Sequence, residues 1–322
     1  MGDIELGIGA RRICSLLPSA TEIVFALGLG DRLVAVTHEC DYPPAAATKA
    51  TVTSSIISAA TLSQAEIDVA VRESLADNAT IYHLDRDQLE RLQPDLILTQ
   101  NLCTVCAVGT NEVLDVTASI SSRPVVQSLE PTTLSGVLDS ILTVGRLTGS
   151  MQAAIALVNE LRDRIGAVRD AVTDLSLVSV LTLEWLDPPF IGGHWVPEMV
   201  ALAGGRDVLG RAGRPSVQVS WDDIAAQDPD VIVVMPCGFD LERTKHEANI
   251  VSLPAVWHEL RAVREGQVFA VDGSAYFNRP GPRLIDGVEI LAAIMHPETM
   301  DPRPGFERLP RPEHAARAGS PV

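Results

Sequence analysis

Residues 92–103 read LQPDLILTQNLC, and residues 226–237 read AQDPDVIVVMPC. Each stretch consists of a Pro-Asp turn, a short aliphatic run and a segment that ends in a cysteine. Short aliphatic runs bounded by turn signals and set between helical patterns are typical of buried parallel strands. The repetition therefore predicts an α/β fold with two similar lobes, each built on a mostly parallel sheet. Further strands are predicted over residues 12–17, 33–36, 125–128, 177–181 and 267–271.

The composition allows two hydrophobic cores and excludes several classes of partner. The chain has 322 residues, of which 46% are hydrophobic, and its formal net charge is −17. A field of that sign repels phosphate backbones, so we expect no nucleic-acid partner. No run approaches the roughly 18 apolar residues that cross a bilayer, so we expect no membrane insertion.

Two features of the sequence predict a cytoplasmic protein. Residues 1–12 lack the apolar stretch of a signal peptide. The five cysteines do not have the spacing of a disulfide framework, which fits a reducing compartment.

Helical periodicity over residues 131–172, broken at Thr148-Gly149, predicts a long helical connection between the lobes. Capping-box patterns at residues 19–22, 63–66 and 220–223 are expected to start helices. From residue 299 onward, five prolines and a low apolar content predict a disordered tail. The expected boundaries are residues 11–130 for an N-terminal α/β lobe, 131–174 for the connecting helices, 175–298 for a C-terminal α/β lobe and 299–322 for the tail.

Four cysteines follow predicted strands in the two lobes: Cys40, Cys103, Cys106 and Cys237. Ligands of open α/β sheets bind beyond the carboxyl ends of strands, so these thiols are expected on the binding rim. Thiolates suit zinc, copper(I), cobalt or an iron–sulfur cluster. The alternative is that free cysteines act as small hydrophobic residues, which is the interpretation for Cys14 within a strand.

Aromatic residues make up only 4% of the chain, yet Trp185, Trp195 and Tyr276 follow strands or glycine-flanked turns. Aromatic walls suit a flat macrocycle, whereas the alternative role of such residues is to cover the edge of a core. His194 follows two glycines that allow close approach to a ligand, and an imidazole is a possible axial ligand to cobalt or iron. Arg279 is a candidate partner for carboxylate or amide groups of a ligand.

Four segments together resemble the cobalamin-binding proteins of ABC importers, in the helical-backbone class of metal-chelate substrate-binding proteins. The segments are SLLPSATE at residues 15–22, DYPP at 41–44, PDLI at 94–97 and YFNRPGPR at 276–283. The resemblance extends over residues 11–297. It implies two Rossmann-like lobes joined by one long helix, with a corrin or metal chelate held between them. It also implies that Tyr276 is an aromatic contact to the corrin.

We therefore expect non-catalytic binding of cobalamin, a related corrinoid or another metal chelate in a cleft between the lobes. Common catalytic motifs are missing, so no catalytic residues are predicted. The expected ligand-binding residues are Tyr42, Trp185, His194, Trp195, Tyr276 and Arg279, and the expected metal ligands are Cys40, Cys103, Cys106 and Cys237.

Two alternatives stay open at the level of sequence. One is a thiol-ligated metal or iron–sulfur protein with a redox or enzymatic role on the same fold. The other is a ferric-siderophore or haem substrate-binding protein of an ABC importer. Importer-linked members of the class carry a secretion signal, which this sequence does not show, and this argues against docking to an ABC permease.

Overall fold

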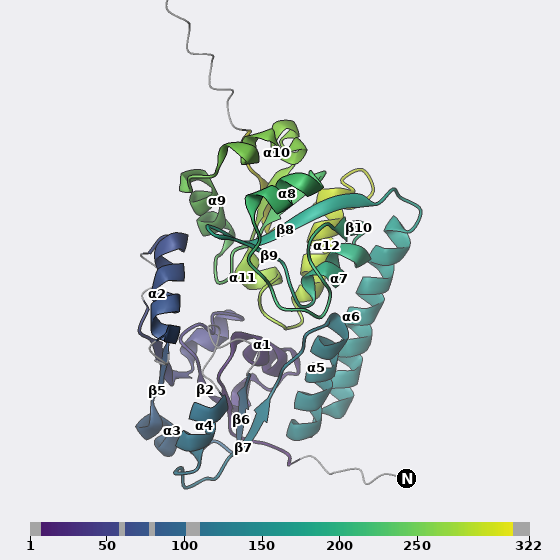
Figure 1. Ribbon diagram of the computed structural model, residues 1–322. Helices are drawn as coiled ribbons and strands as arrows, with labels where there is room; N and C mark the ends of the chain where they lie inside the picture. The colour runs from purple at the N-terminus through teal and green to yellow at the C-terminus, as the bar shows by residue number, and fades with distance from the viewer. Residues whose placement is uncertain (1–7, 58–61, 77–80, 101–109, 312–322) are drawn as a thin grey trace, which may run out of the picture. The chain divides into compact units, whose positions relative to one another are not determined.

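The computed structural model describes residues 8–57, 62–76, 81–100 and 110–311 (Figure 1). The chain divides into two compact units. Unit 1 consists of residues 1–167 and 279–285, and unit 2 consists of residues 168–278 and 286–322. Each unit contains a mostly parallel sheet with helices packed on it, which confirms the predicted α/β fold of two Rossmann-like lobes.

The main sheet of unit 1 is parallel throughout, in the order β3-β2-β1-β6-β7. Its strands are β1 (Ile13–Ser15), β2 (Leu33–Val36), β3 (Ala50–Thr51), β6 (Leu96–Thr99) and β7 (Val125–Ser128). A separate antiparallel pair joins β4 (Thr53–Ser55) to β5 (Tyr82–Leu84). The strand order reverses beside β1, and in open α/β sheets such a switch point is where ligands bind.

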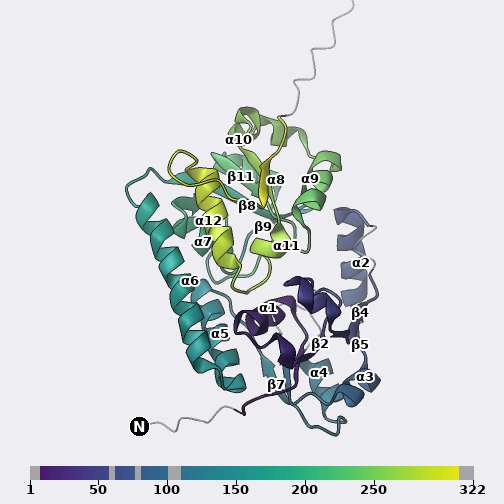
Figure 2. The same ribbon diagram turned by 180° about the vertical axis from the view of Figure 1, so that it is seen from behind.

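Helices cover both faces of this sheet (Figures 1 and 2). On one side lie α3 (Arg86–Leu92) and α4 (Thr110–Thr117), and on the other lie α1 (Pro18–Ala26) and α5 (Leu134–Thr148). The remaining elements are α2 (Gln64–Ala76) and the short 3₁₀ helices η1 (Gly30–Arg32) and η2 (Pro44–Thr48). The core on the α3 side includes Cys14, Leu16, Ala35, Leu89, Ile97 and Val113.

The predicted helical connection is confirmed, including its break. Helix α5 ends at Gly149, whose φ of +69° provides a left-handed cap, and α6 (Met151–Val172) begins two residues later. The 22 residues of α6 carry the chain from unit 1 into unit 2. Gly145 of α5 packs so closely on α6 that a Cβ at this position would overlap the Cβ of Ala154.

The sheet of unit 2 repeats the strand order of unit 1. Strands β10, β8, β11 and β12 are parallel neighbours in the same way as β2, β1, β6 and β7. The two similar stretches of sequence therefore form equivalent strands, β6 and β11, each paired with the first strand of its unit. The strands of this sheet are β8 (Val178–Leu186), β9 (Pro189–Ile191), β10 (Gly205–Asp207), β11 (Val231–Val234), β12 (Val268–Val271) and β13 (Phe306–Arg308).

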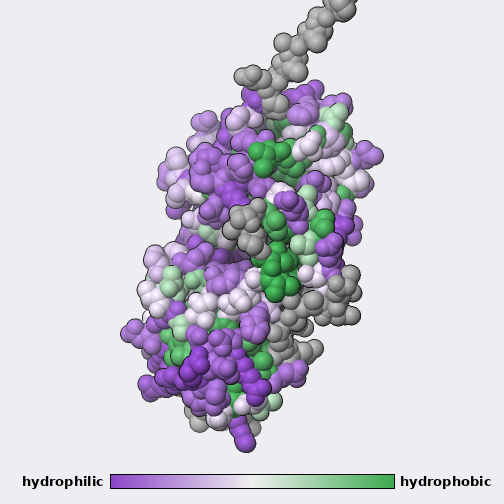
Figure 3. Space-filling view, turned by 90° about the vertical axis from the view of Figure 1, so that its left-hand side faces the viewer, coloured by the Kyte–Doolittle hydropathy of each residue, from purple (hydrophilic) through white to green (hydrophobic). Residues whose placement is uncertain are grey.

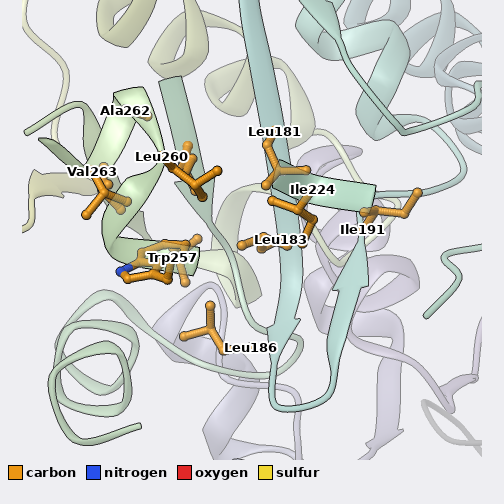
Figure 4. Packing of buried hydrophobic residues seen from close by; sticks show 12 residues of the cluster. Leu181, Leu183, Leu186, Ile191, Ile224, Trp257, Leu260, Ala262 and Val263 are labelled. Carbon is orange, nitrogen blue, oxygen red and sulfur yellow. The ribbon is translucent and has the colours of Figure 1, made fainter. Parts of the chain in front are cut away.

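Helices also cover both faces of the sheet of unit 2. The core in Figure 4 joins β8 to helices on one face, where Leu181, Leu183 and Trp257 point toward one another. The helices of this face are α8 (Trp221–Gln227), η4 (Ala255–Glu259) and α10 (Arg261–Glu265). The opposite face carries α7 (Val196–Leu202) and α12 (Leu284–Met295), and the unit also contains α9 (Leu241–Ile250) and α11 (Gly273–Tyr276).

Two expectations from the sequence are corrected. The disordered tail predicted from residue 299 does not hold for β13, which pairs antiparallel with β12 and stacks Phe306 edge-on against Phe269. The open edge of the sheet supplies backbone partners that a polar segment can use. The capping box predicted at residues 19–22 is also wrong, because α1 begins at Pro18 without a side-chain cap. The boxes at 63–66 and 220–223 are confirmed.

Among the described residues, no helix has both the length and the apolar character to cross a bilayer. On the face in Figure 3, hydrophilic residues predominate and apolar residues form small separate patches. Single exposed apolar side chains such as Ile56, Val69 and Ile250 are common on protein surfaces and do not by themselves indicate a binding site.

Substitution of one glycine in each of the two helices tests the close packing of α5 on α6. Gly145→Ala should lower the free energy of unfolding by about 1–3 kcal/mol, because the new methyl group overlaps Ala154. Gly166→Ala on α6 is the matched control, because nothing lies within 4 Å of its added Cβ. The control should gain about 1 kcal/mol from helix propensity. Urea unfolding measures both changes, and equal effects of the two substitutions would contradict the packing.

Candidate functional site

The loop after β2 carries several polar and aromatic side chains at the carboxyl edge of the sheet of unit 1. Tyr42 is the most accessible aromatic residue there, with 45% of its surface exposed. Nδ1 of His38 lies 2.8 Å from Oγ1 of Thr53, and the rings of His38 and Tyr82 are 5.7 Å apart. His38 is thus held by its own unit, while the ring of Tyr42 faces outward from the loop.

A buried ion pair lies behind this loop. Glu22 of α1 is 4% exposed and accepts two hydrogen bonds from Arg283, at 2.6 Å from Nη2 and 2.9 Å from Nε. Burial raises the pKa of Glu22 even though the bonds from Arg283 oppose that shift. The guanidinium carbon of Arg283 lies 4.0 Å from the ring centroid of Tyr42. The ion pair therefore supports one face of that ring.

A second arginine fixes the same loop. Arg279 donates hydrogen bonds from Nη2 to Oδ2 of Asp41 and to the carbonyl oxygen of Glu39, both at 3.2 Å. Its Nη1 also pairs with Asp41 and lies 3.9 Å from Oε1 of Glu22. Both arginines are thus engaged with carboxylates of unit 1. The prediction that Arg279 contacts a ligand stays a prediction.

Three segments that carry the family resemblance meet in this cluster. They supply Glu22, the pair Asp41 and Tyr42, and the pair Arg279 and Arg283, all within unit 1. Sequence reasoning missed the role of Glu22, because its position in α1 looked like the end of a capping box. The only available signal was that Glu22 and Arg283 both lie in segments that carry the family resemblance.

The surroundings of Cys40 are those of a structural thiol. It is 5% exposed, and its sulfur lies 3.1 Å from Oγ1 of Thr21 and 3.2 Å from Oγ1 of Thr37. Burial raises the pKa of Cys40, so the neutral thiol is favoured over the thiolate that a metal requires. Burial also raises the pKa of Cys14, which lies in the core of unit 1 as predicted.

The other predicted metal ligands do not form a site in the part of the chain that is described. Cys237 is exposed beyond the carboxyl end of β11, as the sequence predicted. Cys103 and Cys106 lie outside the described residues. Across residues 8–57, 62–76, 81–100 and 110–311, no group of three or more His, Cys, Asp or Glu side chains could hold a metal ion. The thiol-bound metal or iron–sulfur cluster is therefore not supported.

Trp185, near the carboxyl end of β8, has an unsatisfied donor. Its ring packs 5.4 Å from that of Phe239, which follows β11, and the guanidinium of Arg243 covers Phe239 at 3.8 Å. The indole Nε1 of Trp185 is buried and has no hydrogen-bond partner among the described residues. A buried N–H without an acceptor is costly unless an ordered water accepts from it.

His194 and Trp195 form a stacked pair in unit 2, with ring centroids 5.5 Å apart. His194 has a φ of +50° and is fixed by backbone hydrogen bonds to Gly213 and Arg214. Burial lowers the pKa of His194, which favours the neutral imidazole. Trp195 is only 4% exposed and donates from Nε1 to the carbonyl oxygen of Phe277 at 2.7 Å, so it supports His194 from within the core.

Tyr276, at the end of α11, packs against the C-terminal segment of unit 2. A Cβ on Gly305 would lie 2.6 Å from Cε2 of Tyr276, so the glycine lies directly against the ring. The predicted contact of Tyr276 with a corrin is not tested by this packing and stays a prediction.

Two carboxylates of the sheet of unit 2, Glu184 on β8 and Asp207 on β10, are held by neutral donors. Glu184 accepts hydrogen bonds from the backbone N–H of Gly193, at 3.1 Å, and from the hydroxyl of Ser216. Asp207 accepts a hydrogen bond from Oγ1 of Thr182 at 2.7 Å. Burial raises the pKa of both carboxyl groups. Sequence reasoning missed both residues, because single acidic residues in strands carry no pattern.

Comparisons with known proteins agree with this architecture. A family model described as periplasmic binding protein matches residues 13–275. The cobalamin-binding protein of Halobacterium salinarum is 27% identical over 302 residues, which cover 92% of this chain and 72% of that protein.

Two solved structures show the same fold. The periplasmic vitamin B12 binding protein of Vibrio cholerae has a TM-score of 0.65 and 24% identity, and the match covers 89% of this chain and 97% of that one. A periplasmic haem-binding protein from Pseudomonas aeruginosa has a TM-score of 0.71 and 18% identity, with coverages of 94% and 98%.

The expectation of a cytoplasmic protein is wrong. The matching family and the Vibrio cholerae protein are both described as periplasmic, which places such proteins outside the cytoplasm. The argument from cysteine spacing carries little weight for Cys14 and Cys40, which are buried free thiols. A buried thiol is inert whatever the redox state of its surroundings, so it does not report a reducing compartment.

Replacement of Glu184 should change how stability depends on pH. Its raised pKa means that the folded state takes up a proton at a pH where the unfolded state does not. The contribution of this group to the free energy of unfolding is therefore largest below the unfolded-state pKa and is lost as the pH rises through the folded-state pKa. Glu184→Gln should be more stable relative to wild type at about pH 7.5 than at about pH 5, by urea unfolding.

Glu90 provides a control, because its pKa is shifted in the opposite direction from that of Glu184. Hydrogen bonds from Ser121 lower the pKa of Glu90, so its contribution to stability is present at neutral pH and lost on acidification. Glu90→Gln should therefore lose more stability at about pH 7.5 than at about pH 3, which lies below the ordinary pKa of a glutamate. Parallel pH profiles for wild type and Glu184→Gln would show that Glu184 is not perturbed.

Proposed function

The chain belongs to the periplasmic binding protein family, and from this premise we propose that it binds cobalamin or a related corrinoid as the substrate-binding protein of an importer. The proposal covers binding without catalysis. The name of the Halobacterium salinarum relative, which aligns with 92% of this chain, supports a corrinoid as the ligand. The partner proposed with it is an ABC permease, which is typical of the family, although the sequence alone argued against such docking.

The structural observation that supports the proposal is the exposed ring of Tyr42. It is 45% exposed on the loop after β2, beside the strands where the order of the sheet reverses. Loops at such a switch point are the usual ligand-binding region of open α/β sheets. An aromatic face held from behind by Arg283 suits the flat surface of a corrin ring.

The polar groups fit an amide-rich chelate better than a strongly anionic one. The periphery of a corrin carries amide groups, which offer carbonyl acceptors. Neutral amides need no cation in the site. Arg279 and Arg283 are already paired with Asp41 and Glu22. An anionic chelate such as haem or a ferric siderophore would need cations that are not neutralised in this way.

We include His194, Trp195, Tyr276 and Arg279 in the proposed binding set, with different roles. The neutral imidazole of His194 is available for hydrogen bonding or metal coordination, and Trp195 supports it from the core. Tyr276 and Arg279 would act from the segment that links α11 to α12. Of the four predicted cysteine ligands, we propose none, because Cys40 is structural and no metal-binding cluster includes Cys237 among the described residues.

Titration of the purified protein tests the ligand. Cyanocobalamin and hydroxocobalamin should each quench tryptophan fluorescence saturably, because the corrin absorbs where tryptophan emits. Isothermal calorimetry should give a stoichiometry of one ligand per chain. Haem and a ferric siderophore serve as comparison ligands. Tighter binding of either one, or no heat with any corrinoid, would refute the proposal.

Tyr42→Ala should weaken corrinoid binding by about 1–3 kcal/mol, the range expected when a stacked aromatic ring is removed. The residue is 45% exposed in the free protein, so the free energy of unfolding should change less than the binding free energy. Calorimetric titration and urea unfolding of the same preparation separate the two effects. An unchanged affinity would remove Tyr42 from the site.

A further inference from the structure

The side chain of Tyr42 is held more firmly than its exposure suggests. The guanidinium carbon of Arg283 lies 4.0 Å from the ring centroid, so one face of the ring is covered by a planar cation. Asp41, the preceding residue, is paired with Arg279. The loop is therefore anchored at the ring of Tyr42 and at the neighbouring side chain, and the second face of the ring is left for other contacts.

Arg283 owes its own position to a buried partner. Both oxygens of the Glu22 carboxylate accept from it, at 2.6 and 2.9 Å, which fixes the plane as well as the place of the guanidinium. Glu22 lies on α1 between Thr21 and Ile23, which are 0% exposed. The position of the Tyr42 ring is thus linked to the interior of α1 through this bidentate pair.

The two arginines of this cluster face carboxylates. Arg279 and Arg283 pair with Asp41 and Glu22, and Glu39 also interacts electrostatically with Arg279. The side chain of Arg283 is only 15% exposed, and the Glu22 carboxylate compensates its charge within unit 1. Its effect on a ligand would therefore be indirect, through the orientation of the Tyr42 ring that stacks on it.

We propose that the Glu22–Arg283 ion pair is a positioning device that holds the ring of Tyr42 in a ligand-ready orientation. The inference rests on the proposed function, because it assigns a role to Tyr42 in binding a flat chelate. Preorganisation of an aromatic face lowers the entropy that is lost on binding, so the ion pair raises affinity without touching the ligand. Arg283 and Glu22 are positioning residues in this account.

The test removes the pair without leaving a buried charge. The double variant Glu22→Met/Arg283→Met replaces both partners by apolar side chains, a change that folded proteins generally tolerate. Its affinity for cyanocobalamin should fall about tenfold, in the range of a cation–π contact. Arg283→Lys keeps the charge but not the bidentate geometry, and it should show a similar loss.

A double-mutant cycle with Tyr42 separates positioning from a general structural effect. In the Tyr42→Ala background, the double variant should cause no further loss of affinity, because the ring through which it acts is gone. The matched control is Glu289→Met/Arg303→Met in unit 2, where a buried glutamate pairs with an arginine at 3.1 Å. That control should leave affinity unchanged in either background, with urea unfolding recorded for every variant.

The outcomes distinguish this inference from the proposed function. No corrinoid binding by wild type refutes the proposed function and removes the premise of the inference. Binding by wild type with an unaltered affinity in Glu22→Met/Arg283→Met overturns the inference alone. The inference is also overturned if the loss is equally large in the Tyr42→Ala background, because the ion pair would then act by another route.

Discussion

The buried ion pair between Glu22 and Arg283 is the interaction on which the candidate site depends. It joins α1 to residues 279–285, which belong to unit 1 although the preceding 111 residues belong to unit 2. Removal of one partner of a buried pair typically costs about 3–5 kcal/mol, because the other charge is left without compensation. The pair therefore constrains the segment, and the segment in turn holds the loop that carries Tyr42.

Much of the fold could be predicted because buried parallel strands leave a local signal. Residues 33–36 and 125–128 were predicted as strands at the bounds of β2 and β7, and the repeated stretches are β6 and β11. The prediction for β8 was too short, since this strand continues from residue 181 to Leu186. Its extension contains Glu184 and Trp185 and is decided by pairing with β9 and β11, which a local pattern does not contain.

The candidate site could be predicted only in part, because its decisive contacts join residues far apart in sequence. Tyr42 and the arginines came from motifs, but nothing near Glu22 indicates a partner 261 positions away. The position of Cys40 after a strand was predicted correctly, whereas its role depends on the hydroxyls of Thr21 and Thr37. Strand β13 depends on the open edge of β12 rather than on its own composition.

The candidate site residues of the two units satisfy their polar groups in different ways, although unit 2 also contains a buried ion pair, between Glu289 and Arg303. In unit 1, Arg279 and Arg283 are paired with Asp41 and Glu22 before any ligand arrives. Unit 2 holds Glu184 and Asp207 with neutral donors and leaves the indole N–H of Trp185 unsatisfied. For the proposed ligand, the ring of Tyr42 offers a flat contact surface, and the pairing of Arg279 and Arg283 leaves them little charge for an anionic group. A corrinoid, whose periphery carries neutral amides, fits this arrangement better than a chelate whose recognition depends on carboxylates.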